Sequence, residues 1–257
     1  MSDALAVLFD NRDDASAQLC VLVPVRNDRR LFKLLEGLGT QARADVHVYI
    51  LNDLKPEPLI TQLTPPLRGV VLYSRRDLTI AQKVNALMSQ AQGEWLVLIE
   101  SDTVPHENWL SEILALAQKA DPHAVHQGGE IFAKLPNMNN ILFRKDLGVP
   151  AFDDTMHWAQ DTAWFIACGK AGIRVVPHEQ QALMFHDARR MEGDMRFIQF
   201  ARDFAYLAVL MNDGDLLKRR LLAEAYYLVK GAASLPALLG FYVYYRLKTL
   251  VKGRRAI

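Results

Sequence analysis

One stretch of the sequence constrains the fold more than any other: residues 95–102, which read Trp-Leu-Val-Leu-Ile-Glu-Ser-Asp. Its five leading apolar residues are typical of a strand buried on both faces of a parallel sheet. Glu100 and Asp102 follow, and in an extended segment this spacing points both carboxylates the same way. Ligands of open α/β sheets bind at the carboxyl ends of strands, so the pattern predicts a Mg²⁺ or Mn²⁺ site there. The alternative is a solvated acidic loop.

Apolar runs elsewhere alternate with helical patterns. Strands are predicted at residues 19–25, 46–51 and 69–73, and helices at residues 31–38, 80–90 and 108–119. This alternation predicts right-handed crossovers, and therefore an α/β fold with a Rossmann-like, mostly parallel sheet. Pro24 has no N–H to donate, so we expect it where strand pairing ends. The sequence contains neither a G-x-G-x-x-G in the first crossover nor a Walker-type loop, which disfavours dinucleotide and P-loop chemistry.

The chain divides into three parts by its patterns. Residues 1–18 are expected to be a loose lead-in, and residues 19–215 a single large domain, followed by a basic tail at 216–257. The later part of the domain is less regular. There we predict a strand over 125–133 interrupted by two glycines, an Asn-rich connection over 136–146, a helix from Asp161 to Gly172, and short strands at 174–176 and 182–185.

Several of these elements together resemble the family 2 inverting glycosyltransferases, which have the A-type nucleotide-sugar transferase fold. The resemblance covers roughly residues 19 to 187. It is carried by residues 21–27 (VLVPVRN), residues 81–85 (AQKVN) leading to 91–95 (AQGEW), and the acidic triplet at 100–102. In that family a nucleotide-binding half, here 19–103, joins an acceptor-binding half, here 104–215.

The resemblance implies a set of nucleotide-binding residues. Pro24, Arg26 and Asn27 would form the first loop under the nucleotide. Asp53 would contact the nucleobase, although a strand-end turn residue is an equal alternative. The family's usual Asp-Asp-Gly-Ser run is Asn-Asp-Leu-Lys at 52–55 in this sequence, which leaves the identity of the base open.

Two positions near residue 84 extend this set. Lys83, with Arg75 or Arg76, would neutralise the diphosphate, and a solvated basic face is the alternative for these side chains. Asn85 matches the family's Asn, although Val84 stands where an Arg usually precedes it.

The resemblance also implies the metal ligands. Glu100 and Asp102 would hold Mg²⁺ or Mn²⁺ on the diphosphate, with Asp102 the direct ligand and Ser101 in contact with the nucleotide. The family more often has Asp at both ends, so Glu100 is a departure that a water-mediated contact would tolerate. His186 would supply a further metal or phosphate contact, against the alternative of a structural histidine.

Asp161 matches the acidic residue that serves as catalytic base in these enzymes. Deprotonation of an acceptor hydroxyl needs a carboxylate within hydrogen-bond reach, with a pKa raised towards the working pH. The alternative is a helix N-cap, because Asp is favoured just before an apolar helix. Gln160 stands where the family commonly has Glu.

The last forty residues differ from the rest in charge. From residue 218 onward there are nine Lys or Arg residues and one acidic residue, whereas the first 217 residues have a formal charge of −7. Residues 231–245 carry no charge but are too short to span a bilayer. We expect residues 216–257 to form amphipathic helices on an anionic membrane surface, and not to bind nucleic acid. The alternatives are a helical pair packed on the domain or on a dimer partner, and a shallow re-entrant hairpin.

These features together predict a metal-dependent inverting glycosyltransferase. The expected donor is a nucleotide sugar, with UDP as the expected nucleotide, and the acceptor a lipid-linked or oligosaccharide hydroxyl at the cytoplasmic face of the cell membrane. Cys20 and Cys168 lie in apolar stretches, which favours a reducing compartment. The alternatives are a sugar nucleotidylyltransferase, for which the first loop lacks the usual glycines, and a catalytically silent membrane-docked scaffold.

Overall fold

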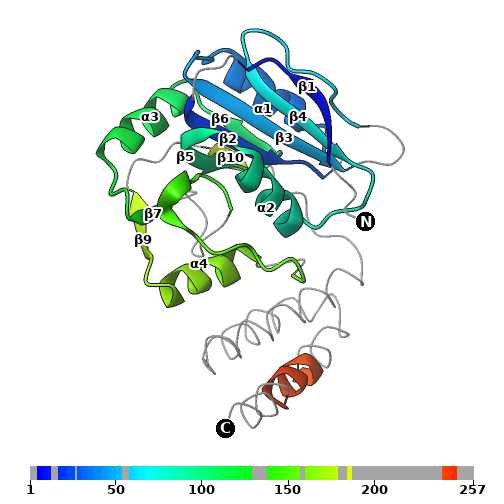
Figure 1. Ribbon diagram of the computed structural model, residues 1–257, viewed down its shortest axis with the longest axis vertical. Coiled ribbons are helices and arrows are strands. Elements are labelled where there is room, and N and C mark those ends of the chain that lie inside the picture. The colour runs from blue at the N-terminus through cyan, green and yellow to red at the C-terminus, as the bar shows by residue number, and fades with distance from the viewer. Residues whose placement is uncertain are drawn as a thin grey trace.

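The computed structural model describes residues 5–12, 17–26, 28–53, 58–128, 138–156, 160–178, 184–186 and 239–247. An eight-stranded sheet has the order β1-β4-β3-β2-β5-β8-β7-β9 (Figure 1). Its strands are β1 (Ala6–Asp10), β2 (Ala17–Pro24), β3 (Val46–Asp53), β4 (Arg68–Ser74), β5 (Gly93–Leu98), β7 (Ala124–Gly128), β8 (Ile141–Arg144) and β9 (Arg174–His178). A second, two-stranded sheet pairs β6 (Thr103–Pro105) with β10 (Met184–His186).

The main sheet is parallel at its centre and mixed towards its edges. Strands β4, β3, β2 and β5 run parallel, while β1 and β8 run antiparallel to their neighbours. The expected α/β architecture is confirmed. The expected loose lead-in is wrong for residues 6–10, because this apolar run pairs with β4 and covers what would otherwise be an open sheet edge.

Four helices cover the two faces of the sheet. Helices α1 (Leu31–Gly39) and α3 (Trp109–Lys119) pack on one face, and α2 (Ile80–Gln90) and α4 (Gln160–Lys170) on the other. Each of the three predicted helices between residues 31 and 119 forms within a residue of its expected ends. The α2 helix begins with a capping box, in which Thr79 and Gln82 each satisfy the other's backbone N–H.

The parallel strands bring their carboxyl ends to one edge of the sheet. Pro24 is the last residue of β2 and pairs with Leu51 of β3, so strand pairing ends near Pro24 as predicted. Leu98 ends β5 on the same edge, opposite the first residue of the antiparallel β8. The segment that enters β8 therefore reaches the same edge as the segment that leaves β5.

Candidate active site

The acidic triplet lies in a turn directly after β5. The Thr103 N–H donates to the Glu100 carbonyl at 3.2 Å, which closes a turn over residues 100–103, called the acidic turn below. The expected extended geometry is therefore wrong, and strand alternation does not set the direction of the two carboxylates. Glu100 and Asp102 contact different partners, and Ser101 between them is buried.

Asn139, in the segment that enters β8, holds the acidic turn in place through three hydrogen bonds. Its Oδ1 accepts from the Glu100 N–H and from the Thr103 hydroxyl, each at 2.8 Å, and its Nδ2 donates to the Glu100 Oε2 at 3.0 Å. Asn139 is itself 1% exposed. The sequence indicated an Asn-rich connection over 136–146 without a role for it, and the antiparallel direction of β8 is what delivers Asn139 to the site.

Arg30 is a second side chain that sequence reasoning did not include. It precedes the first helical residue of α1, and its Nη2 lies 3.1 Å from Asp102 Oδ2. Its Nε also donates to both carboxylate oxygens of Asp28 at 2.9 Å. The guanidinium thus joins the start of α1 to the acidic turn. A basic residue at the first turn after β2 was the available indication.

Asp161 lies in the first turn of α4. The helix begins at Gln160, so Asp161 is already inside it and is not the N-cap. Its Oδ1 accepts from the Thr162 N–H at 2.7 Å. The pKa of Asp161 is raised to about 6, mainly by burial and also by the nearby charge of Glu100, against the opposing hydrogen bond from Thr162. The carboxylates of Asp161 and Glu100 are therefore close enough for their negative charges to repel each other.

Lys83 is fully buried, so a solvated basic face is excluded for this side chain. Its Nζ donates to the carbonyl of Val25, the residue between Pro24 and Arg26. Lys83 thereby holds the loop that leaves β2. Arg26 is exposed, and Asn27 lies outside the described residues. Arg75 and Arg76 are exposed after β4.

Asn85 uses both ends of its amide on one neighbouring residue. Its Nδ2 donates to the Phe152 carbonyl at 2.9 Å, and its Oδ1 accepts from the Phe152 N–H at 2.8 Å. The Phe152 ring in turn stacks on Trp164 of α4, with centroids 4.7 Å apart. Asn85 therefore fixes the segment that leads to α4, a contact that the sequence did not predict.

Two predicted site residues are placed by their backbones alone. Asp53 ends β3 and pairs with Ser74 of β4, at the same edge as Pro24. His186 pairs with Thr103, next to Asp102, in the two-stranded sheet of β10 and β6. The side chains of Asp53 and His186 lie outside the described residues. The register alone brings His186 beside the acidic turn.

The donor set at the acidic turn suits a hard divalent cation. Glu100 and Asp102 offer carboxylate oxygens and Ser101 a hydroxyl, which are the ligands that Mg²⁺ and Mn²⁺ take. Asp102 already pairs with the Arg30 guanidinium, so a metal ion would compete with this ion pair for the carboxylate. Among the side chains that the structure describes, no cluster of three or more His, Cys, Asp or Glu could by itself hold a metal ion.

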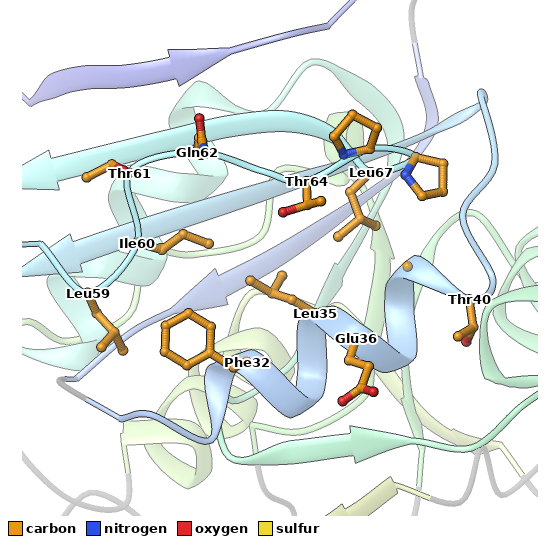
Figure 2. A pocket seen from close by; sticks show the side chains of 13 residues that line it. Phe32, Leu35, Glu36, Thr40, Leu59, Ile60, Thr61, Gln62, Thr64 and Leu67 are labelled. Atoms are coloured by element: carbon orange, nitrogen blue, oxygen red, sulfur yellow. The ribbon is translucent and has the colours of Figure 1, made fainter.

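A groove of about 630 Å³ lies elsewhere, along α1. Figure 2 shows Phe32 and Leu35 rising from α1 towards the segment at 59–67. Its lining includes none of the predicted site residues, so the groove does not bear on the chemistry of the acidic turn.

The comparison with solved structures shows the same fold in sugar-transferring enzymes. The mannosyltransferase PcManGT from Pyrobaculum calidifontis, in complex with GDP-Man and Mn²⁺, has a TM-score of 0.58 at 16% identity, with 97% of this chain and 84% of that chain covered. S. aureus TarS 1-349 in complex with UDP-GlcNAc has a TM-score of 0.55 at 16% identity, with 87% and 71% covered. Glucosyl-3-phosphoglycerate synthase from Mycobacterium tuberculosis has a TM-score of 0.58 at 11% identity, with 76% and 80% covered.

The match to a longer S. aureus TarS structure covers 77% of this chain but only 40% of that one. A comparison with curated proteins found no sequence that matches. The model of the family described as glycosyl transferase family 2 matches residues 20–180, which hold the main sheet from Cys20 in β2 to the end of β9, together with the acidic turn and Asp161. The chain therefore belongs to glycosyl transferase family 2.

Proposed function

We propose that this family 2 glycosyltransferase moves a sugar, with inversion at the anomeric carbon, from a nucleoside diphosphate sugar to a hydroxyl of a lipid-linked or glycan acceptor. The observation that carries the proposal is the pKa of the Asp161 carboxylate, which is raised to about 6 by burial and by the negative charge of Glu100. A general base works best when its pKa lies near the operating pH. A pKa of about 6 for Asp161 supports this role, and Glu100 belongs to the turn where the resemblance in the sequence implies the diphosphate.

The residues divide the reaction between them. Asp161 accepts the proton of the acceptor hydroxyl while that oxygen attacks the anomeric carbon and the bond to the diphosphate breaks. One in-line displacement of this kind inverts the configuration. Glu100, Asp102 and the His186 side chain would hold Mg²⁺ or Mn²⁺, which when bound stabilises the negative charge of the departing diphosphate.

The nucleotide would lie over the carboxyl ends of β2, β3 and β5. Pro24, Arg26, Asn27, Asp53 and Ser101 belong to the segments that leave these strands. Lys83 and Asn85 would act indirectly, because Lys83 donates a hydrogen bond to the carbonyl of Val25 and Asn85 donates one to the carbonyl of Phe152. Two of the similar structures contain GDP-Man and UDP-GlcNAc. We propose a UDP sugar as the donor, because a carboxylate at Asp53 can accept the ring N–H of uracil.

The deciding experiment measures release of nucleoside diphosphate from UDP and GDP sugars, with Mn²⁺ or with EDTA. The proposal expects release that EDTA abolishes, and loss of transfer in Asp161→Asn with donor binding retained. Asp154→Asn, an exposed carboxylate in the segment before α4, is the matched control. Pyrophosphate release from a nucleoside triphosphate and a sugar phosphate would instead indicate a nucleotidylyltransferase. Donor binding without turnover would indicate a silent scaffold.

We also propose that the tail at residues 216–257 binds the cytoplasmic surface of an anionic membrane. Residues 239–247 form a helix in which Leu239, Val243, Tyr244 and Leu247 are each 45–58% exposed, with spacings that put them along one side. Lys and Arg residues dominate the charge of the surrounding sequence. Within the described residues, no helix has the length and hydropathy needed to cross a bilayer.

Vesicle sedimentation of the full chain tests this binding. Vesicles with phosphatidylglycerol should retain the protein and vesicles of phosphatidylcholine should not. The double substitution Val243→Glu and Leu247→Glu should release it. Val7→Glu changes a similarly exposed apolar residue in β1 and serves as the control. Equal retention of all variants would contradict membrane binding through this helix.

A further inference from the structure

Arg30 forms an ion pair with the carboxylate that the proposed function assigns to the metal. The Arg30 Nη2 and Asp102 Oδ2 lie 3.1 Å apart, and the two side chains are 18% and 15% exposed. The Arg30 Nε donates to both carboxylate oxygens of Asp28, and Nη2, the nitrogen that faces Asp102, also donates to Asp28 Oδ2. One largely buried cation therefore bridges two carboxylates, one at the start of α1 and the other in the acidic turn.

Helix α1, which Arg30 precedes, packs closely against β6, the strand that follows the acidic turn. A Cβ on Gly37 of α1 would lie 3.0 Å from the Pro105 ring of β6. The helix therefore packs closer to this strand than a side chain at position 37 would allow. Asp28 also accepts from the Arg30 N–H at 2.9 Å, which sets the backbone at the helix start. The contact between Arg30 and Asp102 is thus built into the fold.

The Arg30 guanidinium and a divalent cation compete for the Asp102 carboxylate. In the metal-free protein Arg30 neutralises this carboxylate, so a metal ion that arrives alone must displace the arginine. A metal ion that arrives with a nucleoside diphosphate also brings phosphate oxygens, which are good bidentate partners for a guanidinium. The arginine then exchanges one anionic partner for another instead of losing one.

We propose that Arg30 is a positioning residue that couples metal binding to nucleotide binding, an inference that rests on the proposed function. In the free protein Arg30 holds Asp102. When the metal and the nucleotide bind, Asp102 turns to the metal, and Arg30 keeps Asp28 and donates to the diphosphate. By linkage, the nucleotide raises the affinity for the metal by the same factor as the metal raises the affinity for the nucleotide.

The test titrates Mn²⁺ into the full chain, with free Mn²⁺ followed by electron paramagnetic resonance, in the absence and presence of UDP or GDP. The wild type should bind Mn²⁺ weakly alone and at least about tenfold more tightly with the preferred nucleotide, within the usual range of coupling between sites. Arg30→Gln should bind Mn²⁺ alone about tenfold more tightly than the wild type, because the metal ion no longer has to displace the guanidinium from Asp102. The gain from nucleotide should largely disappear.

Arg29→Gln is the matched control, because it removes an adjacent, exposed positive charge at the same helix start. It should behave as the wild type. If Arg30→Gln does not fold, Arg30→Lys decides, since a lysine keeps the charge but cannot fork across two carboxylates. It too should tighten the binding of Mn²⁺ alone and reduce the gain from nucleotide.

The outcomes separate this inference from the proposed function. A wild type that binds Mn²⁺ with UDP or GDP, together with Arg30 variants of unchanged Mn²⁺ affinity and unchanged coupling, overturns the role of Arg30 alone. A wild type that binds Mn²⁺ with neither nucleotide overturns the metal-dependent function itself.

Discussion

Replacement of the proposed base should make the protein more stable and inactive at once. Burial holds the pKa of Asp161 at about 6 in the folded protein, against 3.8 for the ordinary group. The unfolded chain binds the proton less tightly, so the folded state loses stability as the pH rises from about 4 through 6, and the loss is nearly complete above pH 6. At about 1.4 kcal/mol per tenfold change in proton affinity, the penalty is at most about 3 kcal/mol. Because the side chain is partly open to solvent, we expect Asp161→Asn to recover about 1–3 kcal/mol at pH 8.

The substitution keeps the hydrogen bond that the Thr162 N–H donates, because an Asn Oδ1 accepts in the same place. The assay is thermal unfolding of Asp161→Asn and the wild type in EDTA from pH 4 to pH 8. The difference in Tm should be near zero at pH 4 and grow through pH 6 to several degrees, at about 2–4 °C per kcal/mol. Transfer should fall by about 10²–10⁴-fold.

Asp154→Asn should show no such growth with pH, since its carboxylate is exposed. A difference in Tm that does not depend on pH would refute the burial of the Asp161 charge. An Asp161→Asn variant that is less stable than the wild type at pH 8 would refute it as well.

Three further outcomes follow from the described contacts. The wild-type kcat/KM should rise about tenfold per pH unit below pH 6 and level off above it, because only ionised Asp161 accepts a proton; a flat profile from pH 5 to pH 8 would exclude it as the base. Asn139→Ala removes three hydrogen bonds in a buried place and should cost about 2–3 kcal/mol in urea unfolding. Gly39→Ala should raise the free energy of unfolding by about 0.5–1 kcal/mol, because a Cβ there meets nothing within 4 Å. Gly37→Ala should not raise it, because its Cβ would lie 3.0 Å from the Pro105 ring. Equal effects at both glycines would contradict the close packing of α1.

The sequence predicted the parallel core well because each of its elements has a local pattern. The strand at 95–98 is a run of apolar residues, and the helix at 80–90 has a periodic apolar face. Periodicity alone cannot show which neighbour a strand selects. The pairing of β1 with β4, and the insertion of β8 between β5 and β7, are therefore results that only the three-dimensional structure gives.

The sequence indicated candidate site residues but not the partners that hold them. The acidic turn and Asp161 were identified through the resemblance, and the family match covers both. The partners Arg30 and Asn139 lie about seventy and forty residues from Asp102 in the sequence, and nothing local marks such a contact. Lys83 was expected to face solvent or phosphate, yet it is buried, because the carbonyl of Val25 satisfies its ammonium group inside the helix–sheet layer.

The double hydrogen bond between Asn85 and Phe152 has a mechanical consequence. Phe152 stacks on Trp164, so α2, the segment before α4, and α4 itself are joined in series. A rotation of α4 away from the central strands would have to break both hydrogen bonds of the Asn85 side chain or separate the stacked rings of Phe152 and Trp164. The proposed proton acceptor, Asp161 on α4, is therefore tied to α2, and we expect any opening that admits substrates to come from other parts of the protein.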